Sequence, residues 1–258
     1  MKMSTSKKIT VMIQARTGSN RLPNKVLEKI GNKPMIWYVI NRVKQIKSVQ
    51  QIILITTKEK SDQILLKIAE DEGIIGYAGT GDPNDVLDRH FQCALKFDAD
   101  PIIRITGDCP LIDPFLVEEI LQFYIKNNFD YVSNSIIPTY PDGLDTEIFS
   151  FNTLKKIFEC SKLYSEREHV TLFIQNNPQL FTFFNYANNE DLSKIRLTVD
   201  EIQDLELIRK IYSKMKPKII FSMNEILKII LNEPDILNIN KGIKRNEGLV
   251  KSLKKDEV

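Results

Sequence analysis

Residues 11–25, VMIQARTGSNRLPNK, place two arginines and a lysine in a loop that also contains glycine and proline. The loop follows a short apolar run and precedes a helix expected to begin at Pro34, where an α/β sheet presents a nucleotide-binding loop. It has neither the P-loop pattern nor the three glycines of a dinucleotide fingerprint. The cations Arg16, Arg21 and Lys25 therefore predict a phosphate site of another type, with a solvated surface loop as the alternative.

Two aspartates stand at the ends of expected strands. Asp108 follows an apolar run at 101–106 and a glycine, and Asp200 ends the run IRLTVD at 195–200. Each could instead be a turn or capping residue bonded to nearby backbone. Together they offer two carboxylates for Mg²⁺, which commonly takes one or two protein carboxylates and completes its shell with water and substrate phosphates.

Short β-branched runs alternate with helical patterns in the first half of the chain. The runs at 9–14, 51–56, 73–78 and 101–106 predict buried parallel strands. Helices are predicted from Pro34, over 61–73, after Asp82 as N-cap with Asp85 in the first turn, and after a cap at Asp113. The alternation predicts an α/β fold with a doubly wound sheet, in which ligands bind beyond the carboxyl ends of the strands.

After residue 130 the pattern changes. Residues 130–150 are strand-like but interrupted by Pro138, Pro141 and Gly143, so a hairpin or an extended loop is expected. Helices are predicted near 151–160 and 165–175, and a short strand over 195–200 is followed by an amphipathic helix. Residues 1–8 are expected to be a flexible N-terminus, residues 9–239 a single domain, and residues 240–258 a polar, peripheral tail.

The composition is that of an ordinary soluble protein. Because 36 Lys and Arg oppose 34 Asp and Glu, no overall field favours nucleic acid or an anionic membrane as a partner. Cys93, Cys109 and Cys160 lie far apart, which argues against a disulfide framework and a zinc cluster and suits a reducing compartment. No run has the length of a signal peptide or a membrane span, so a cytoplasmic location is expected.

Seven motifs occur in one order along the chain: IQARTGSNRLPNKVL, GDPNDVLDRHFQCA, IIRITGDCPLIDP, DYVSN, TYPDGLDTEIFS, SEREHVT and IRLTVDEIQDLELIRKIY. In them the chain resembles the cytidylyltransferase family typified by the spore coat polysaccharide protein SpsF and, more distantly, the CMP-Kdo and CMP-sialate synthetases. The resemblance implies a Rossmann-like nucleotidyltransferase fold, a mostly parallel sheet flanked by helices with a small β-rich acceptor-binding insertion at about 130–195. It also implies that an acceptor oxygen attacks the α-phosphorus of CTP and pyrophosphate leaves, in the synthesis of surface polysaccharide or glycan precursors.

The resemblance assigns the opening loop to the triphosphate. Nucleotidyl transfer needs positioning and charge neutralisation more than covalent help from the protein. Arg16, Lys25 and Asp108 are expected to be catalytic, and Asp108 and Asp200 to hold Mg²⁺. The implied nucleotide-binding residues are Gln14, Ala15, Arg16, Gly18, Arg21, Lys25, Thr80, Gly81, Asp85 and Thr106.

The acceptor is expected to be a sugar acid, a sugar phosphate or a phosphorylated polyol. The residues implied to bind it are Asp142, Asp145, Glu147, Glu166, Arg167 and His169. An arginine and a histidine beside acidic residues could bind the hydroxyls and the anionic group of such an acceptor. For Glu166 and Arg167 a charge cluster at a helix start is the alternative, and His90 is expected to be a packing or surface histidine.

Two other functions stay open at this stage. One is a nucleotide-sugar glycosyltransferase on the same fold, although such enzymes usually use a D-x-D pair after a strand, and this chain has DAD only at 98–100, before a strand. The other is a nucleotide-binding protein without catalysis. The acceptor and the base preference are likewise open, and a homodimer is possible by analogy with the family.

Overall fold

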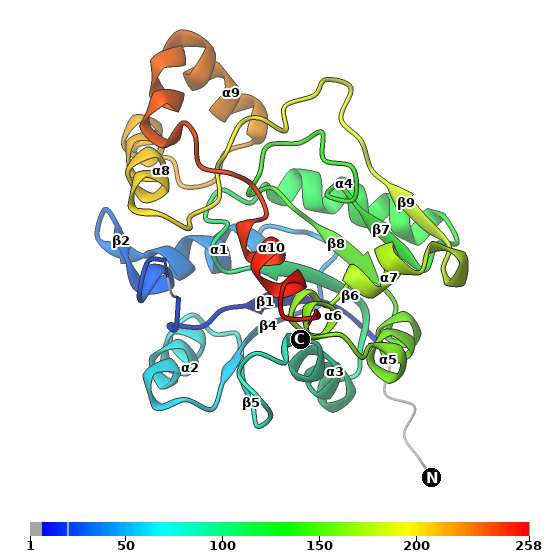
Figure 1. Cartoon of the computed structure of the whole chain (residues 1–258). Coiled ribbons are helices and arrows are strands. Elements are labelled where there is room, and N and C mark those ends of the chain that lie inside the picture. Colours follow the sequence, from blue (N-terminus) through cyan, green and yellow to red (C-terminus); the bar gives the residue numbers. More distant parts are fainter. Residues whose placement is uncertain (1–6, 20, 258) are drawn as a thin grey trace.

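The computed structural model describes residues 7–19 and 21–257 and is built around a central β-sheet (Figure 1). Within these residues the sheet has seven strands in the order β5-β4-β1-β6-β8-β7-β9. The first four are parallel, β8 runs antiparallel to both neighbours, and β9 pairs parallel to β7 at the edge. The strands are β1 (Lys8–Gln14), β4 (Gln51–Thr57), β5 (Ile75–Gly79), β6 (Ala99–Thr106), β7 (Tyr131–Ser133), β8 (Glu147–Phe149) and β9 (Phe183–Asn185), with β2 (Lys29–Ile30) and β3 (Lys33–Pro34) paired separately. The predicted, mostly parallel α/β sheet is thus confirmed, while residues 1–6 of the expected flexible N-terminus lie outside the described residues.

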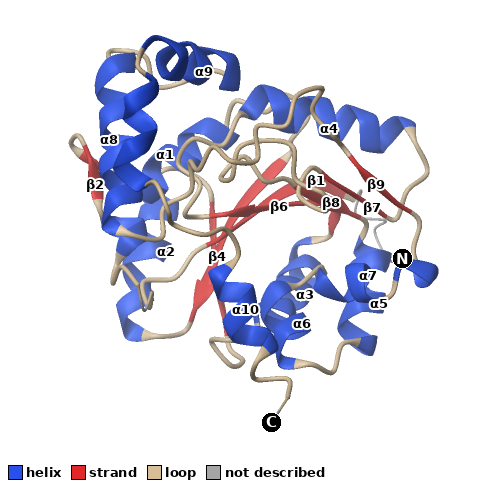
Figure 2. Ribbon diagram, turned by 45° about the horizontal axis from the view of Figure 1, so that its top comes forward, coloured by secondary structure: helices blue, strands red, loops and turns tan. Residues whose placement is uncertain are grey.

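Helices cover both faces of the sheet (Figure 2). Along β1, Val11 and Ile13 belong to one core cluster and Met12 to the other, because successive side chains of a strand point to opposite faces. The first cluster is completed by α1, α2, α4, α8 and α9, and the second by α3, α5 and α7. The helices are α1 (Met35–Val43), α2 (Gln63–Asp71), α3 (Val86–Phe97), α4 (Pro114–Lys126), α5 (Phe151–Cys160), α6 (Tyr164–His169), α7 (Leu172–Asn176), α8 (Ile202–Met215), α9 (Met223–Asn232) and α10 (Glu247–Leu253), with short 3-10 turns η1 (Lys25–Leu27), η2 (Lys60–Asp62), η3 (Pro178–Leu180) and η4 (Pro234–Asn240). A search of the described residues finds no helix with the length and apolar character of a membrane span.

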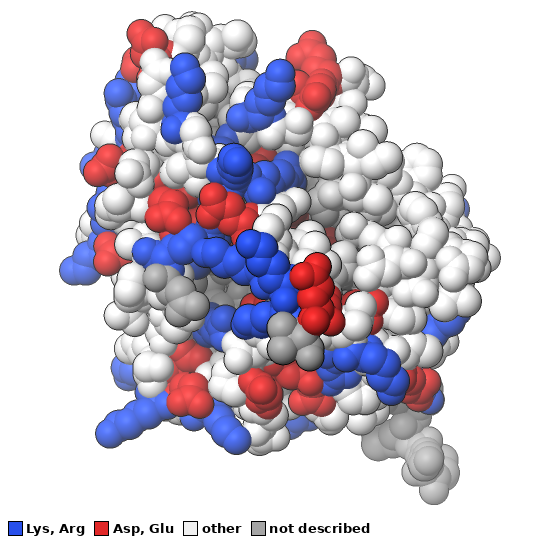
Figure 3. All heavy atoms as spheres, viewed as in Figure 1, with Lys and Arg blue, Asp and Glu red and all other residues white. Residues whose placement is uncertain are grey.

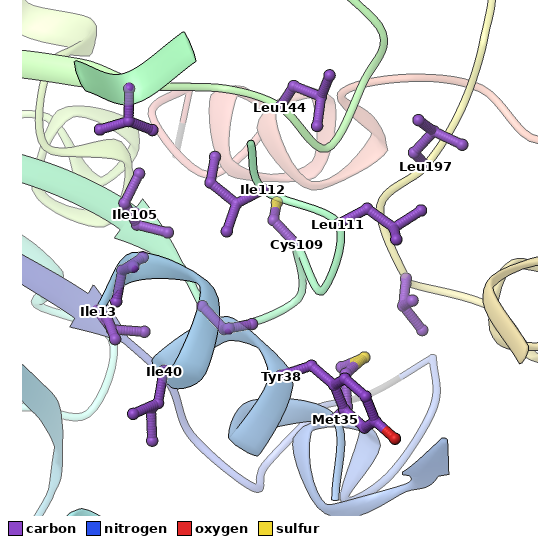
Figure 4. Packing of buried hydrophobic residues seen from close by; sticks show 14 of the residues in the cluster. Ile13, Met35, Tyr38, Ile40, Ile105, Cys109, Leu111, Ile112, Leu144 and Leu197 are labelled. Carbon is purple, nitrogen blue, oxygen red and sulfur yellow. The ribbon is translucent and has the colours of Figure 1, made fainter. Parts of the chain in front are cut away.

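Buried leucines fix the segments that carry the candidate aspartates (Figure 4). Leu111, Leu144 and Leu197 are fully buried in the first core cluster. Each lies within three positions of an aspartate that the sequence analysis singles out. Because full burial of a leucine side chain contributes about 1.5–3 kcal/mol, these side chains hold three separate loops against one core.

The helix starts follow capping chemistry, with one correction. Asp113 caps α4 as predicted, and its carboxylate accepts hydrogen bonds from two backbone N–H groups of the first turn, at 2.9 and 3.4 Å. Helix α3 is capped by Asp85, which accepts from the backbone N–H of Asp88 at 2.9 Å, and not by Asp82. Asp82 accepts from the N–H of Asn84 at 2.7 Å, so the turn around Pro83 ends before the helix begins.

Two further expectations after residue 130 are corrected. The helix predicted near 165–175 is two short helices, α6 and α7, separated at Val170, whose φ is 53°. Residues 195–200 form no strand but an extended connection with one isolated bridge, between Arg196 and Asp142. Its backbone is bonded to two loops instead: Leu197 N–H donates to the carbonyl of Asp142 at 2.6 Å, and Val199 N–H to that of Asp108 at 2.9 Å.

The C-terminal segment, defined as residues 241–257, is not the peripheral arm that its polar sequence predicts. It contains α10, which packs against α6. The Ser252 hydroxyl donates to Glu168 at 2.5 Å, and Asp256 accepts from the backbone N–H of Ser165 at 2.9 Å. These polar contacts explain why a segment with few apolar residues still docks onto the body of the protein.

Candidate active site

A pocket of about 670 Å³ opens at the carboxyl ends of β1 and β6. β1 pairs with β4 on one side and β6 on the other, which is the switch point where α/β sheets bind ligands. Gly107 permits the close approach of the two strand ends, because an added Cβ would lie 2.8 Å from the Ala15 Cβ and 3.1 Å from the Gln14 carbonyl oxygen. The predicted residues that line the pocket are Gln14, Ala15, Arg16, Gly18, Arg21, Lys25, Thr106, Asp108, Asp142, Asp145, Glu147, His169 and Asp200.

A buried aspartate anchors the first half of the basic loop. Asp62 accepts hydrogen bonds from the backbone N–H of Thr17 at 2.7 Å, from the Thr17 hydroxyl at 2.6 Å and from the Thr57 hydroxyl. Burial opposes the negative charge of Asp62, but these hydrogen bonds outweigh it and lower its pKa. Sequence reasoning missed Asp62, because it lies 45 positions from the residue that it holds.

Lys25 lies between the two predicted metal ligands. Its Nζ is 2.7 Å from Asp108 Oδ2 and 2.8 Å from Asp200 Oδ1, and it also donates to the Val199 carbonyl at 3.0 Å. Burial alone would lower the pKa of Lys25, but the two aspartates outweigh it and raise this pKa. The structure therefore brings together a loop cation and two carboxylates that are separated by 83 and 175 positions in the sequence.

The two arginines of the loop point to different parts of the pocket rim. Arg21 Nη2 is 2.7 Å from Asp200 Oδ1, and its Nη1 is 3.6 Å from Glu247 at the start of α10. Arg16 donates through Nη1 to Asn84 Oδ1 at 3.0 Å, on the turn before α3. The basic loop thus contacts the aspartate pair, the turn before α3 and the start of α10.

Arg196 is a buried hub that sequence reasoning missed. Its Nε donates to Asp204 Oδ1 at 2.9 Å, its Nη1 to Asp142 Oδ2 at 2.8 Å, and its Nη2 to Asp200 Oδ2 at 2.8 Å. Burial opposes the charge of Asp200, but Lys25 and its other cationic partners lower its pKa to about 2. The only signal in the sequence is the spacing of four between Arg196 and Asp200 in IRLTVD.

The side of the pocket lined by the predicted acceptor-binding residues is rich in carboxylates. Burial raises the pKa of Asp142 and raises that of Asp145 to about 6, although nearby arginines act in the opposite direction. Glu147 pairs with Arg104 and accepts from the Tyr131 hydroxyl at 2.7 Å. Arg104, like Arg196, lies in a quoted motif, but the sequence does not show which acid it meets.

Two predicted acceptor residues lie outside the pocket lining and support the fold nearby. Arg167 forms an ion pair with Asp85, with its Nε 3.0 Å from Asp85 Oδ2. Glu166 accepts from the backbone N–H groups of residues 162 and 163 at 3.3 and 3.4 Å, so it caps α6 as the charge-cluster alternative proposed. His169 does face the pocket, where its Nε2 lies 3.0 Å from the Ser252 hydroxyl, and burial lowers its pKa.

The pocket lining also omits part of the predicted nucleotide set. Asp85 caps α3, and Thr80 accepts from the Lys58 ammonium at 2.8 Å through its carbonyl. At Gly81 an added Cβ would lie 2.7 Å from Asp88 Oδ2, so a larger residue there would displace the Asp88 side chain of α3. His90 is fully buried and its Nδ1 lies 2.9 Å from the Val86 carbonyl, as expected of a packing histidine.

The donor set at Asp108 and Asp200 fits a hard divalent cation. Their carboxylate oxygens converge on one cationic centre, the Lys25 ammonium, and oxygen is the donor that Mg²⁺ prefers. Among the described residues no group of three or more His, Cys, Asp or Glu side chains is arranged to hold a metal. A site of two carboxylates therefore suits a cation that takes its remaining ligands from water and phosphate.

Comparison with known proteins adds independent findings. A sequence model described as cytidylyltransferase matches residues 10–236. An uncharacterized protein of Methanocaldococcus jannaschii is 37% identical over 240 residues, which cover 92% of this chain and 96% of the relative. The spore coat polysaccharide biosynthesis protein SpsF of Bacillus subtilis is 31% identical over 234 residues, covering 88% and 95%. The solved structure of a cytidylyltransferase from Leptospira borgpetersenii superposes with a TM-score of 0.87 at 32% identity, covering 93% of this chain and all of that one.

Proposed function

Because the chain belongs to the cytidylyltransferase family and is a CTP-dependent nucleotidyltransferase, we propose that it transfers CMP from CTP to a small anionic acceptor and releases pyrophosphate. The acceptor is a sugar acid, a sugar phosphate or a phosphorylated polyol, and the product is a precursor of a surface polysaccharide or related glycan. The likeness to a relative named for spore coat polysaccharide biosynthesis supports this role.

The observation that carries the proposal is the position of Lys25 at the switch point of the sheet. Asp108 and Asp200 hold its ammonium within 2.8 Å and raise its pKa, so the group is cationic at neutral pH. A triphosphate bound along the basic loop meets this ammonium together with Arg16 and Arg21. Cations that neutralise the outer phosphates lower the barrier to their departure as pyrophosphate.

Mg²⁺ belongs to the same proposal. Asp108 and Asp200 are the residues that would hold it, since their carboxylates already converge on one point. When bound, the ion supplies further charge neutralisation at the phosphate oxygens. The protein's own contribution is to keep the Asp200 carboxylate ionised, because Lys25 and its other cationic partners lower its pKa to about 2.

The acceptor occupies the opposite side of the pocket in this proposal. Asp142, Asp145 and Glu147 line it and offer hydrogen-bond acceptors to hydroxyl groups. His169 is neutral at neutral pH, because burial lowers its pKa, so one ring nitrogen can accept a proton or hydrogen bond. These groups orient an acceptor oxygen towards the α-phosphorus between the two halves of the pocket.

The test is a pyrophosphate-release assay with the four ribonucleoside triphosphates and a panel of sugar acids, sugar phosphates and phosphorylated polyols. The wild-type protein is expected to release pyrophosphate from CTP only when an acceptor and Mg²⁺ are present. Lys25→Met is expected to lower kcat roughly 100- to 1,000-fold, the usual effect of removing one charge-stabilising donor. Lys29→Met, which removes an exposed lysine of β2 outside the pocket, is the matched control. Normal turnover by Lys25→Met would show that the site assignment is wrong.

A further inference from the structure

The C-terminal segment forms one wall of the pocket although it lies beyond residues 10–236, the part of the chain that the family model matches. Arg245, Leu249 and Lys251 of this segment line the pocket together with the basic loop and the acceptor side. Figure 1 shows α10, in red, over the middle of the molecule, and Figure 3 shows Lys and Arg side chains beside Asp and Glu side chains over the same part of the surface. The C-terminal segment therefore supplies a wall of the pocket that carries charged side chains.

The segment is held in place on two sides of the pocket. On the acceptor side, the Ser252 hydroxyl lies between His169 and Glu168 of α6. On the nucleotide side, Glu247 lies 3.6 Å from the Arg21 guanidinium. These two contacts fix the part of the segment that lines the pocket.

Arg245 lines the pocket two positions before Glu247, and its guanidinium is only partly satisfied. Its Nη2 lies 2.7 and 2.9 Å from the two oxygens of Asp145, and its Nε lies 3.6 Å from Asp142 Oδ1. Its Nη1 is buried and has no hydrogen-bond partner among the described residues. Because buried N–H donors in native proteins almost always meet an acceptor, an unpaired guanidinium nitrogen beside a substrate pocket indicates a donor for a ligand.

We propose that Arg245 binds the anionic group of the acceptor through Nη1, while Asp145 orients the guanidinium. This inference rests on the proposed function. The ligand group is an oxyanion, a carboxylate or a phosphate, because the arginine fork matches both. Acceptor choice is then set in part by a segment that lies outside residues 10–236, the region that the family model matches.

The test measures separate KM values for acceptor and CTP by pyrophosphate release. The acceptor panel contains two carboxylates, glucuronate and 3-deoxy-manno-octulosonate, and two phosphates, glucosamine 1-phosphate and glycerol 3-phosphate. The panel member with the highest kcat/KM is used to compare the variants, and its class identifies the oxyanion. Arg245→Gln is expected to raise the acceptor KM roughly 10- to 100-fold, the effect of losing a hydrogen bond to a charged group, and to leave the CTP KM unchanged. Arg245→Lys keeps the positive charge but cannot form the two parallel hydrogen bonds of a guanidinium, so it is expected to have an acceptor KM between those of the wild type and Arg245→Gln. Lys244→Gln, an exposed neighbour outside the pocket, is the matched control.

The outcomes separate this inference from the proposed function. If the wild-type protein binds CTP but turns over no member of the panel, the proposed function is overturned and this inference with it. If the wild-type protein is active and Arg245→Gln has an unchanged acceptor KM, only this inference is overturned. An equal rise in both KM values, or a melting temperature well below that of Lys244→Gln, would assign Arg245 a structural role and also overturn it.

Discussion

Arg196→Met is the substitution whose effect follows most directly from the structure. The methionine keeps most of the side-chain volume but removes the charge that Asp142, Asp200 and Asp204 share. Asp204 is fully buried, so water cannot replace its lost partner, and the side chains of the other two are only 10% and 16% exposed. Removing one partner of a buried ion pair costs about 3–5 kcal/mol.

The assay is thermal unfolding at neutral pH. For a domain of this size each kcal/mol corresponds to about 2–4 °C, so Arg196→Met is expected to melt roughly 6–20 °C below the wild type. The matched control is Arg209→Met, because Arg209 pairs with Glu28 at 3.1 Å where both side chains are 39% exposed. Exposed pairs contribute about 0–1 kcal/mol. If both variants melt within about 2 °C of each other, the hub has no energetic importance and the reasoning is refuted.

Two smaller perturbations test the loops around this hub. Gly143→Ala is expected to lower the melting temperature, because Gly143 has a φ of 102° and an added Cβ would lie 2.5 Å from the nitrogen of Thr198. The control is Gly248→Ala, because a Cβ added there would meet nothing within 4 Å. Equal melting temperatures of the two variants would contradict the argument. For Asp145, burial raises the pKa from 3.8 to about 6, so the folded state binds the proton more tightly than the unfolded state. The contribution of the Asp145 carboxyl group to stability is therefore complete below pH 3.8 and is lost as the pH rises through 6. The free energy of unfolding, measured by urea titration, should fall between these pH values in the wild type and fall less in Asp145→Asn. If the two proteins lose the same free energy over this pH range, the raised pKa is contradicted.

The parts of the fold that local sequence patterns determine were predictable. Buried parallel strands have continuous β-branched runs, and the runs before Gln14, Thr57 and Thr106 became β1, β4 and β6. The resemblance to the cytidylyltransferase family, found in contiguous motifs at the strand ends, is confirmed by the family match over residues 10–236. Because carboxyl ends of parallel strands meet at one edge, a basic loop after one strand and an aspartate after another had to converge.

The remaining parts depend on partners that sequence spacing does not show. Arg245 meets Asp145 across 100 positions, and Arg104 meets Glu147 across 43. The strand predicted at 195–200 is wrong for a related reason: its alternating apolar residues do reach the core, but its backbone bonds to two loops and not to the sheet. Apolar periodicity reports burial of side chains, whereas strand identity requires a backbone partner that only the tertiary fold supplies.

The two carboxylate oxygens of Asp200 have different partners: Oδ1 contacts cations of the basic loop, and Oδ2 contacts an arginine that is held in the core. Oδ1 contacts Lys25 at 2.8 Å and Arg21 at 2.7 Å, and both cations belong to the basic loop. Oδ2 contacts Arg196, which is fixed by the fully buried Asp204. In the proposed function, a triphosphate bound along the basic loop would compete with Oδ1 for these cations and replace one anion by another, so the cations would keep their charge compensation. Because Oδ2 would stay with Arg196 during this exchange, the carboxylate would keep its position while Oδ1 became free to hold the proposed Mg²⁺.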